Sequence, residues 1–230
     1  MMTLSGFVLQ RLTCDRALGG AIGESDCELL RDGLLAQPVL TWTSLAYVAA
    51  AVGLAITTRV VDARRTLATA FVVSLALIGI GSVLFHGPQP DGTRWIHDVP
   101  IVACLLSMVA IDAAQIGVVT IRQATAFWIA GTVTTAVVTA VAADVALVVG
   151  AVTVAALVVA EVLVRRPRRT WVPLLTVGVV AAVLNGLGRT DAPLCDPESV
   201  VQWHGVWHVL TAFGFVLWGR AALVPDRAPA

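Results

Sequence analysis

The amino-acid sequence predicts an all-α membrane protein, a bundle of seven transmembrane helices with its N-terminus outside and its C-terminus in the cytoplasm. Three observations predict this fold class. Of the 230 residues, 58% are hydrophobic and only 13% are charged, and the mean hydropathy is +0.87, which is too apolar for a soluble domain. The chain divides into apolar runs of about 20 residues, the length that crosses a bilayer core of roughly 30 Å. Its arginines, finally, are distributed unevenly over the polar segments between these runs.

Each apolar run is expected to form one helix, with short loops between them. Residues 1–37 precede the first run and would form an extracytoplasmic segment. This segment is expected to be retained, because its opening stretch has no basic start and is therefore unlike a signal peptide. The seven-helix domain would span 38–222, followed by a short cytoplasmic tail, 223–230. The expected helices are 38–57, 67–86, 97–118, 124–142, 145–164, 171–188 and 203–222.

The distribution of arginine predicts the orientation, because positively charged loops stay in the cytoplasm. With the N-terminus outside, ten arginines fall on the inner side and five on the outer side, and the cluster RRPRRT at 165–170 contributes most to the difference. The net charge is zero without any block of like charge, so a nucleic-acid partner is not expected. All 15 cationic side chains are arginine, and the absence of lysine excludes a retinal Schiff base.

All four histidines fall near the outer end of the predicted bundle. His86 ends the second helix, His97 begins the third, and His204 and His208 begin the seventh. Residues four apart share one face of a helix, so His204 and His208 can bind one metal ion. With His86 they supply three ligands, the number that a catalytic zinc site takes from protein while leaving a position for water. A single histidine there is more often an interfacial residue, and the H-x-x-x-H pair taken alone suits an interface and a metal site equally well.

The polar neighbours of these histidines favour the metal site over the interfacial alternative. Ser82 lies one turn before His86, and Asp98 follows His97 at the same predicted depth. Ionisable side chains buried in a membrane bundle are costly and are usually functional. We therefore expect a zinc site at the outer end of the bundle.

The order of these residues resembles a superfamily of seven-helix membrane hydrolases that includes alkaline ceramidases and adiponectin-receptor-like proteins. The shared pattern is S-x-x-x-H at the end of helix two, Asp at the start of helix three, and H-x-x-x-H in helix seven. The resemblance covers the chain from about Cys27 to Trp218 and is closest to the alkaline ceramidases. It implies zinc held by three histidines and hydrolysis of the amide bond of ceramide, a lipid with a long acyl chain. The matching residues are Ser82, His86, Asp98, His204 and His208.

The resemblance also implies a disulfide, because alkaline ceramidases join a cysteine before helix one to a cysteine in the loop before helix seven. The corresponding residues are Cys27 and Cys195, both on the predicted outer side, where oxidation is permitted. Cys14 lies on that side too and could compete.

Animal ceramidases also carry a calcium site around the Cys-Glu pair, for which Asp26 and Glu28 are the candidates in this chain. Leu30 and Pro38 stand near positions where oxygen ligands would be needed. Calcium takes six to eight oxygen ligands, so this depleted set predicts weak binding or none.

Helix three departs from the family pattern. An ungapped comparison anchored on His86 and Pro100 places His97 at the position of the family's Asp, and a slip of one residue in the preceding loop restores Asp98. Asp98 is therefore the expected catalytic carboxylate, His97 would flank it outside the zinc ligands, and His97 as the partner itself stays an alternative.

These residues suit metal-assisted hydrolysis of a lipid amide or ester. Zinc lowers the pKa of a bound water to about 7 and polarises a carbonyl. Asp98 would pass a proton from the zinc-bound water to the leaving amine, or would orient a ligand histidine. Ser82 would donate a hydrogen bond to the oxyanion. One alternative is a receptor-like or structural seven-helix protein with a non-catalytic zinc site. A haem carrier is disfavoured, because the neighbouring Ser, His and Asp side chains have no evident role at a haem.

Overall fold

The computed structural model describes residues 22–58, 64–142 and 145–223, and within them the fold is entirely helical. Six of the α-helices are long and apolar enough to cross a membrane, whereas the qualifying apolar stretch of α6, Val148–Val164, is shorter. The all-α fold is thus confirmed, with six helices able to span a membrane, and the full count of seven spans stays a prediction. The elements are η1 (Glu24–Asp26), α2 (Pro38–Thr57), α3 (Arg65–His86), α4 (Thr93–Gln115), α5 (Ile121–Val141), α6 (Val145–Val164), α7 (Arg168–Leu187) and α8 (Trp203–Leu223).

The largest difference from the expected boundaries is at α4, which begins four residues before His97. Gly92 precedes the helix in the left-handed conformation, with φ at 76°, and lets the chain turn directly into Thr93. At the other end, Gly117 has φ at 75°, so the helix stops at Gln115 rather than at residue 118. The earlier start places His97 in the second turn of α4.

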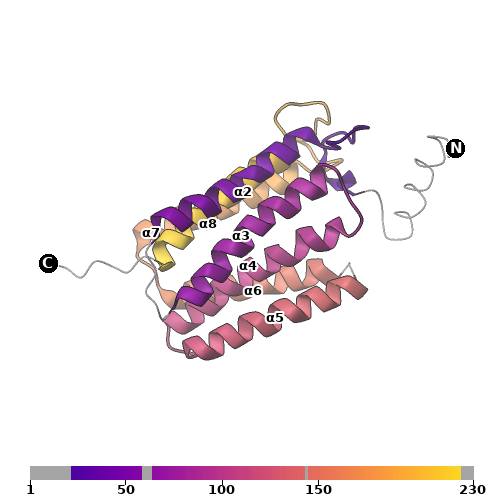
Figure 1. The fold of residues 1–230 in the computed structure, drawn as a ribbon. Helices are drawn as coiled ribbons and strands as arrows, with labels where there is room; N and C mark the ends of the chain where they lie inside the picture. Colours follow the sequence, from indigo (N-terminus) through magenta and orange to yellow (C-terminus); the bar gives the residue numbers. More distant parts are fainter. Residues whose placement is uncertain (1–21, 59–63, 143–144, 224–230) are drawn as a thin grey trace.

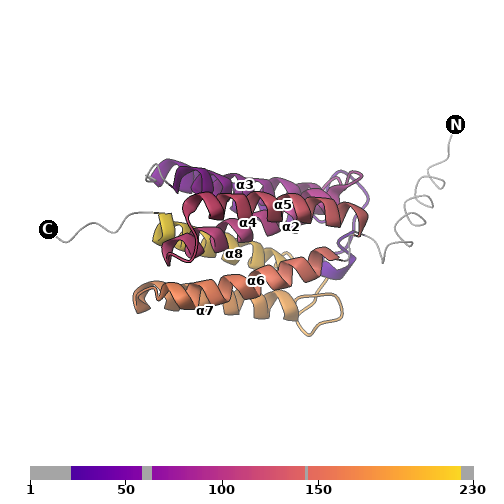
Figure 2. The ribbon, with the colours of Figure 1, turned by 90° about the horizontal axis from the view of Figure 1, so that it is seen from below.

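The helices run lengthwise in one bundle (Figure 1). Helix α2 packs against α3 and α8, and α4 packs against α3, α5 and α6. Helix α8 lies inside the bundle with α7 beyond it (Figure 2). The largest buried side chains of the apolar core come from α2, α3, α4 and α8, and they include Leu54, Phe71, Leu75, Ile111 and Trp218.

Helices α5, α6 and α7 expose their apolar side chains far more than the core helices do. In α7 only Ala181 is buried, although the helix is apolar enough to cross a membrane. Exposed valines of this kind cannot face water over whole helices without cost, and they suit contact with lipid. Examples are Val133, Val137, Val148, Val152, Val159 and Val179.

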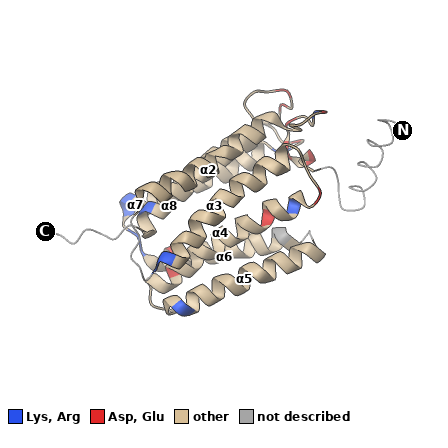
Figure 3. Cartoon of the chain, in the orientation of Figure 1, with Lys and Arg blue, Asp and Glu red and all other residues tan. Residues whose placement is uncertain are grey.

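Basic side chains gather at the end of the bundle where α3, α5 and α7 begin (Figure 3). Arg65, Arg122 and Arg168 lie at or next to these helix starts. The histidines lie at the opposite end, because His86 ends α3 whereas His204 begins helix α8. This separation agrees with the arginine asymmetry in the sequence, and the orientation in the membrane stays a prediction.

A glycine allows α3 and α4 to approach closely beside His97. A Cβ atom added to Gly81 would lie under 3.0 Å from the carbonyl oxygen of Ile96 and 3.1 Å from the Cα of His97. Backbone atoms cannot rotate away as the end of a side chain can. Gly81 therefore sets how near α4 lies to α3 at this end of the bundle.

We predict that Gly81→Ala destabilises the protein by about 1–3 kcal/mol, the usual cost of overpacking a tight contact. Gly53→Ala is the matched control, because a Cβ on Gly53 in α2 would meet nothing within 4 Å. Thermal unfolding in detergent should show a lower midpoint for Gly81→Ala only. Equal midpoints for the two variants would contradict the close approach.

Candidate metal centre

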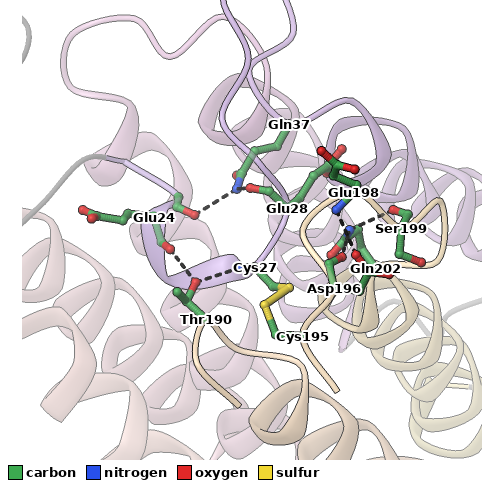
Figure 4. The surroundings of a disulfide bond; sticks show 11 residues. Glu24, Cys27, Glu28, Gln37, Thr190, Cys195, Asp196, Glu198, Ser199 and Gln202 are labelled. Carbon is green, nitrogen blue, oxygen red and sulfur yellow. Dashed lines mark hydrogen bonds between the residues drawn. A yellow bond between two sulfur atoms is a disulfide. The ribbon is translucent and has the colours of Figure 1, made fainter. Parts of the chain in front are cut away.

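The segment before α2 covers the histidine end of the bundle and is tied there covalently. Cys27 forms a disulfide with Cys195 in the loop between α7 and α8, with 5.6 Å between their Cα atoms (Figure 4). The predicted pairing is therefore confirmed. Cys104 is buried as a free thiol, whereas Cys14 lies outside the described residues.

Hydrogen bonds fasten this N-terminal segment to the same loop. The Thr190 hydroxyl donates to the carbonyl oxygen of Glu24 at 2.6 Å and accepts from the backbone N–H of Cys27 at 3.1 Å (Figure 4). The backbone N–H of Leu29 donates to the carbonyl oxygen of Pro197. The segment is thus held in place from both sides of the disulfide.

Glu28 positions the start of α2. Its two carboxylate oxygens accept from the backbone N–H groups of Val39 and Leu40, each at 2.9 Å. These N–H groups have no partner within the helix, and a carboxylate is favourable at the positive end of the helix dipole. Pro38, which has no N–H to satisfy, occupies the first turn. Glu28 therefore acts as the cap of this helix.

Three imidazoles converge beneath the N-terminal segment. His86 from α3 and His204 and His208 from α8 are all buried, and each offers a ring nitrogen within 4.8 Å of the others. The ring centroids of His204 and His208 are 4.6 Å apart, and His86 lies 5.3 Å from His208. The residues expected to bind one metal ion are thus brought together and could hold one.

The hydrogen bonds of Gln37 determine which nitrogen of His86 carries the proton. The Gln37 Nε2 group donates to the carbonyl oxygens of Gly23 and Glu28, each at 2.9 Å. With both amide hydrogens used, Oε1 faces Nδ1 of His86 at 2.8 Å and can only accept. Nδ1 therefore carries the hydrogen, and Nε2 keeps its lone pair for a metal ion.

Thr43 plays the same part for His208. Its hydroxyl donates to carbonyl oxygens of its own helix, those of Val39 at 3.0 Å and Leu40 at 3.1 Å. The hydroxyl oxygen is then left to accept from Nδ1 of His208 at 3.1 Å. Nε2 of His208 is consequently the nitrogen available as a ligand.

Asn185 of α7 completes the set, with its Oδ1 2.7 Å from Nδ1 of His204. A side-chain oxygen therefore lies against Nδ1 of every histidine in the group. Histidines that bind metal usually donate their second ring nitrogen to such an acceptor, which fixes the tautomer and the ring orientation.

The unpartnered nitrogens support the fit to a metal ion. Nε2 of His86 and Nε2 of His208 are buried and have no hydrogen-bond partner within the part of the chain that the structure describes. Burying a ring nitrogen without a partner is costly. Three neutral imidazoles suit zinc well. The residues present therefore fit the metal that the sequence predicts.

A pocket of about 440 Å³ opens beside the histidines. His86 and His204 line one side of it, while His97 and Asp98 come from the start of α4. Both candidates for the catalytic partner therefore face the same space as two of the three ligand histidines.

His97 and Asp98 are joined to each other, with Nδ1 of His97 2.7 Å from Oδ1 of Asp98. The His97 ring also packs on Phe85, with 4.5 Å between the ring centroids. The Asp98 side chain is 36% exposed and the His97 side chain 17% exposed. The carboxylate is thus the more accessible member of a hydrogen-bonded pair.

Ser82 lies in α3 one turn from His86, but it is buried and turned towards α2. The Ser44 hydroxyl donates to the carbonyl oxygen of Leu40 at 2.6 Å, so the Ser82 hydroxyl donates to Ser44 at 2.8 Å. Among the described residues, those that line the pocket do not include Ser82. To serve an oxyanion, its hydroxyl would have to turn away from Ser44.

Asp26 lies between two of the histidines, His86 and His204, and the guanidinium of Arg189. It pairs with Arg189 at the end of α7, and its oxygens are 4.0 Å from Nδ1 of His86 and 3.9 Å from Nδ1 of His204. Burial raises the pKa of the Asp26 carboxyl, and the Arg189 guanidinium opposes this increase. Both residues line the pocket.

The two calcium candidates thus have other partners, Asp26 an arginine and Glu28 the first turn of α2. Within the described residues, the triple-histidine group is the only group of three or more histidine, cysteine or acidic side chains close enough together to hold a metal ion. Calcium binding itself stays untested.

Sequence reasoning found the three ligand histidines but missed two of the residues that orient them. The sequence pattern did not indicate a role for Gln37 or Thr43. The sequence did contain a signal for them, because buried ligand histidines need hydrogen-bond acceptors. Gln37 and Thr43 lie at the start of α2, at the same end of the bundle as the histidines.

Comparison of the chain with protein-family models found no match, and neither did comparison with curated proteins.

We predict that Thr43→Val lowers zinc affinity by about 10–100-fold, because it removes the acceptor that orients His208. Thr41→Val is the matched control, since the Thr41 hydroxyl in the same helix donates only to the carbonyl oxygen of Gln37. Competition with a chromogenic chelator should show the loss for Thr43→Val alone. Equal affinities would show that Thr43 does not support the metal.

Proposed function

We propose that the protein is a zinc-dependent intramembrane hydrolase that cleaves the amide bond of ceramide or of a related lipid amide. The observation that carries the proposal is the group of three buried histidines, each oriented through Nδ1, beside a pocket lined by Asp98. Three protein ligands leave a fourth position for water, the arrangement of catalytic zinc sites.

When bound, zinc would acidify a water molecule and polarise the carbonyl of the substrate. Asp98 is the proposed general base, accepting a proton from the attacking water and returning it to the leaving nitrogen. The hydrogen bond from His97 would hold the carboxylate in place. Exposure to the pocket lets Asp98 reach a substrate there.

The position of the pocket supports a lipid substrate. It opens at the end of helices whose outer faces are apolar, so an acyl chain could lie along the bundle while its polar linkage reaches the histidines. Arg94, Arg189 and Asp26 also line the pocket and would meet the polar part of the molecule.

We predict that Asp98→Asn keeps the zinc and lowers kcat by about 10²–10⁴-fold, the usual contribution of general acid–base catalysis. Asp91→Asn is the matched control, because Asp91 is exposed in the turn before α4. The measurements are metal content and fatty acid released from fluorescent ceramides. His97→Gln tests the alternative partner, and a larger loss there than in Asp98→Asn would exchange the two roles.

A zinc-loaded wild-type protein that releases no fatty acid from any ceramide, amide or ester would contradict the hydrolase. It would favour a receptor-like protein with a structural zinc site.

We predict that Ser82→Ala lowers kcat by about 10²–10³-fold if Ser82 donates to the oxyanion, with KM and zinc content unchanged. Ser107→Ala is the control, because Ser107 is equally buried but donates to the carbonyl oxygen of Cys104 within α4. Unchanged kcat in Ser82→Ala would limit Ser82 to its contact with Ser44.

A further inference from the structure

A second group of polar side chains is buried at the end of the bundle opposite the histidines. Asp112 of α4, Glu161 of α6 and Trp218 of α8 meet Arg166 from the segment between α6 and α7. Asp112 is fully buried, and the Arg166 side chain is 5% exposed. Asp112 lies 112 − 98 = 14 residues beyond Asp98 in the same helix, or about 21 Å along its axis. The group is therefore separate from the metal centre.

Glu161 has the hydrogen bonds of an ionised carboxylate. Its Oε1 accepts from the indole N–H of Trp218 at 2.5 Å and from Nη2 of Arg166 at 3.2 Å. Its Oε2 accepts from Nε of Arg166 at 2.9 Å. Three donors thus stabilise a negative charge on this residue.

The carboxyl group of Asp112 accepts fewer hydrogen bonds than that of Glu161. Its Oδ1 accepts from Nη2 of Arg166 at 2.6 Å, but its Oδ2 is buried with no partner in the described parts of the chain. The second acidic group against it is the carboxyl of Glu161. Two ionised carboxylates and one guanidinium would leave a net charge of −1 in an apolar bundle, where an uncompensated charge is costly.

We propose that Asp112 and Glu161 form a proton-binding site in which the proton is held by Asp112. The protonated Asp112, the ionised Glu161 and the cationic Arg166 together carry no net charge. The proton belongs to Asp112 because its Oδ2 is buried without a hydrogen-bond partner among the described residues, whereas both oxygens of Glu161 accept hydrogen bonds. A carboxyl group facing a second carboxylate commonly shares one proton with it. The neutral group then links α4, α6 and α8 at the end remote from the histidines.

Infrared spectroscopy of the full-length protein at neutral pH tests this assignment. A protonated carboxyl has a carbonyl stretching band well separated from that of a carboxylate, and the band shifts in deuterium oxide. Labelling all aspartates with ¹³C should move it, whereas labelling glutamates should not. The band should be lost in Asp112→Asn and kept in Asp191→Asn, a change at an exposed residue of the opposite end.

Stability provides a second readout. Asn has the shape of a protonated Asp and keeps an oxygen for Arg166, so Asp112→Asn should retain the wild-type midpoint of thermal unfolding. Glu161→Gln should lower the midpoint by several degrees, because it removes the charge that balances Arg166. If Asp112→Asn does not fold, the isotope-labelled wild type still decides the question. A missing carbonyl band, or a band that moves only with labelled glutamate, would overturn the proposal. So would a midpoint of thermal unfolding that depends on the sodium concentration, because the site would then bind a sodium ion in place of the proton.

Discussion

The candidate metal centre depends on a hydrogen bond at Nδ1 of each buried imidazole. A neutral histidine has two tautomers, and only the one with a free Nε2 serves the centre of this group. Gln37 selects that tautomer for His86 because its own amide is fixed by the carbonyl oxygens of Gly23 and Glu28. The fold of the N-terminal segment is therefore part of the ligand arrangement of a residue in α3.

This dependence explains how firmly the segment is tied down. The disulfide from Cys27 to Cys195 joins the segment to the loop that leads into α8, the helix of the other two histidines. Glu28 fixes the start of α2 and also supplies one carbonyl oxygen to Gln37. A Cβ on Gly23 would clash with Gln37, so close packing adds to the hydrogen bonds. Removing the segment would leave His86 without its acceptor.

The helices divide into a packed group and a group with exposed apolar faces, and the three histidines come from the first, whereas Asn185 of α7 comes from the second. Helices α2, α3, α4 and α8 bury the large core side chains, and Tyr47 packs edge-on to His208 while donating to or accepting from Thr211 at 2.7 Å. Helices α5 and α7 bury little of their surface.

Hydropathy predicted the helices well because a bilayer imposes one length on apolar runs. The boundary of α4 was missed, since a left-handed Gly92 starts the helix earlier than the apolar pattern does. The histidine group was predictable because i, i+4 spacing and helix order bring the residues to one end, and the resemblance to ceramidases supplied the disulfide. The roles of Gln37 and Thr43 and the pairing of Asp26 with Arg189 depend on how distant segments fold together, which periodicity does not report.

X-ray absorption at the zinc edge of the purified full-length protein tests the central claim most directly. A centre built from His86, His204 and His208 should give three nitrogen ligands at about 2.0–2.1 Å and one further light atom. A sulfur ligand, fewer than three imidazoles, or a protein that takes up no zinc in its folded state would contradict it.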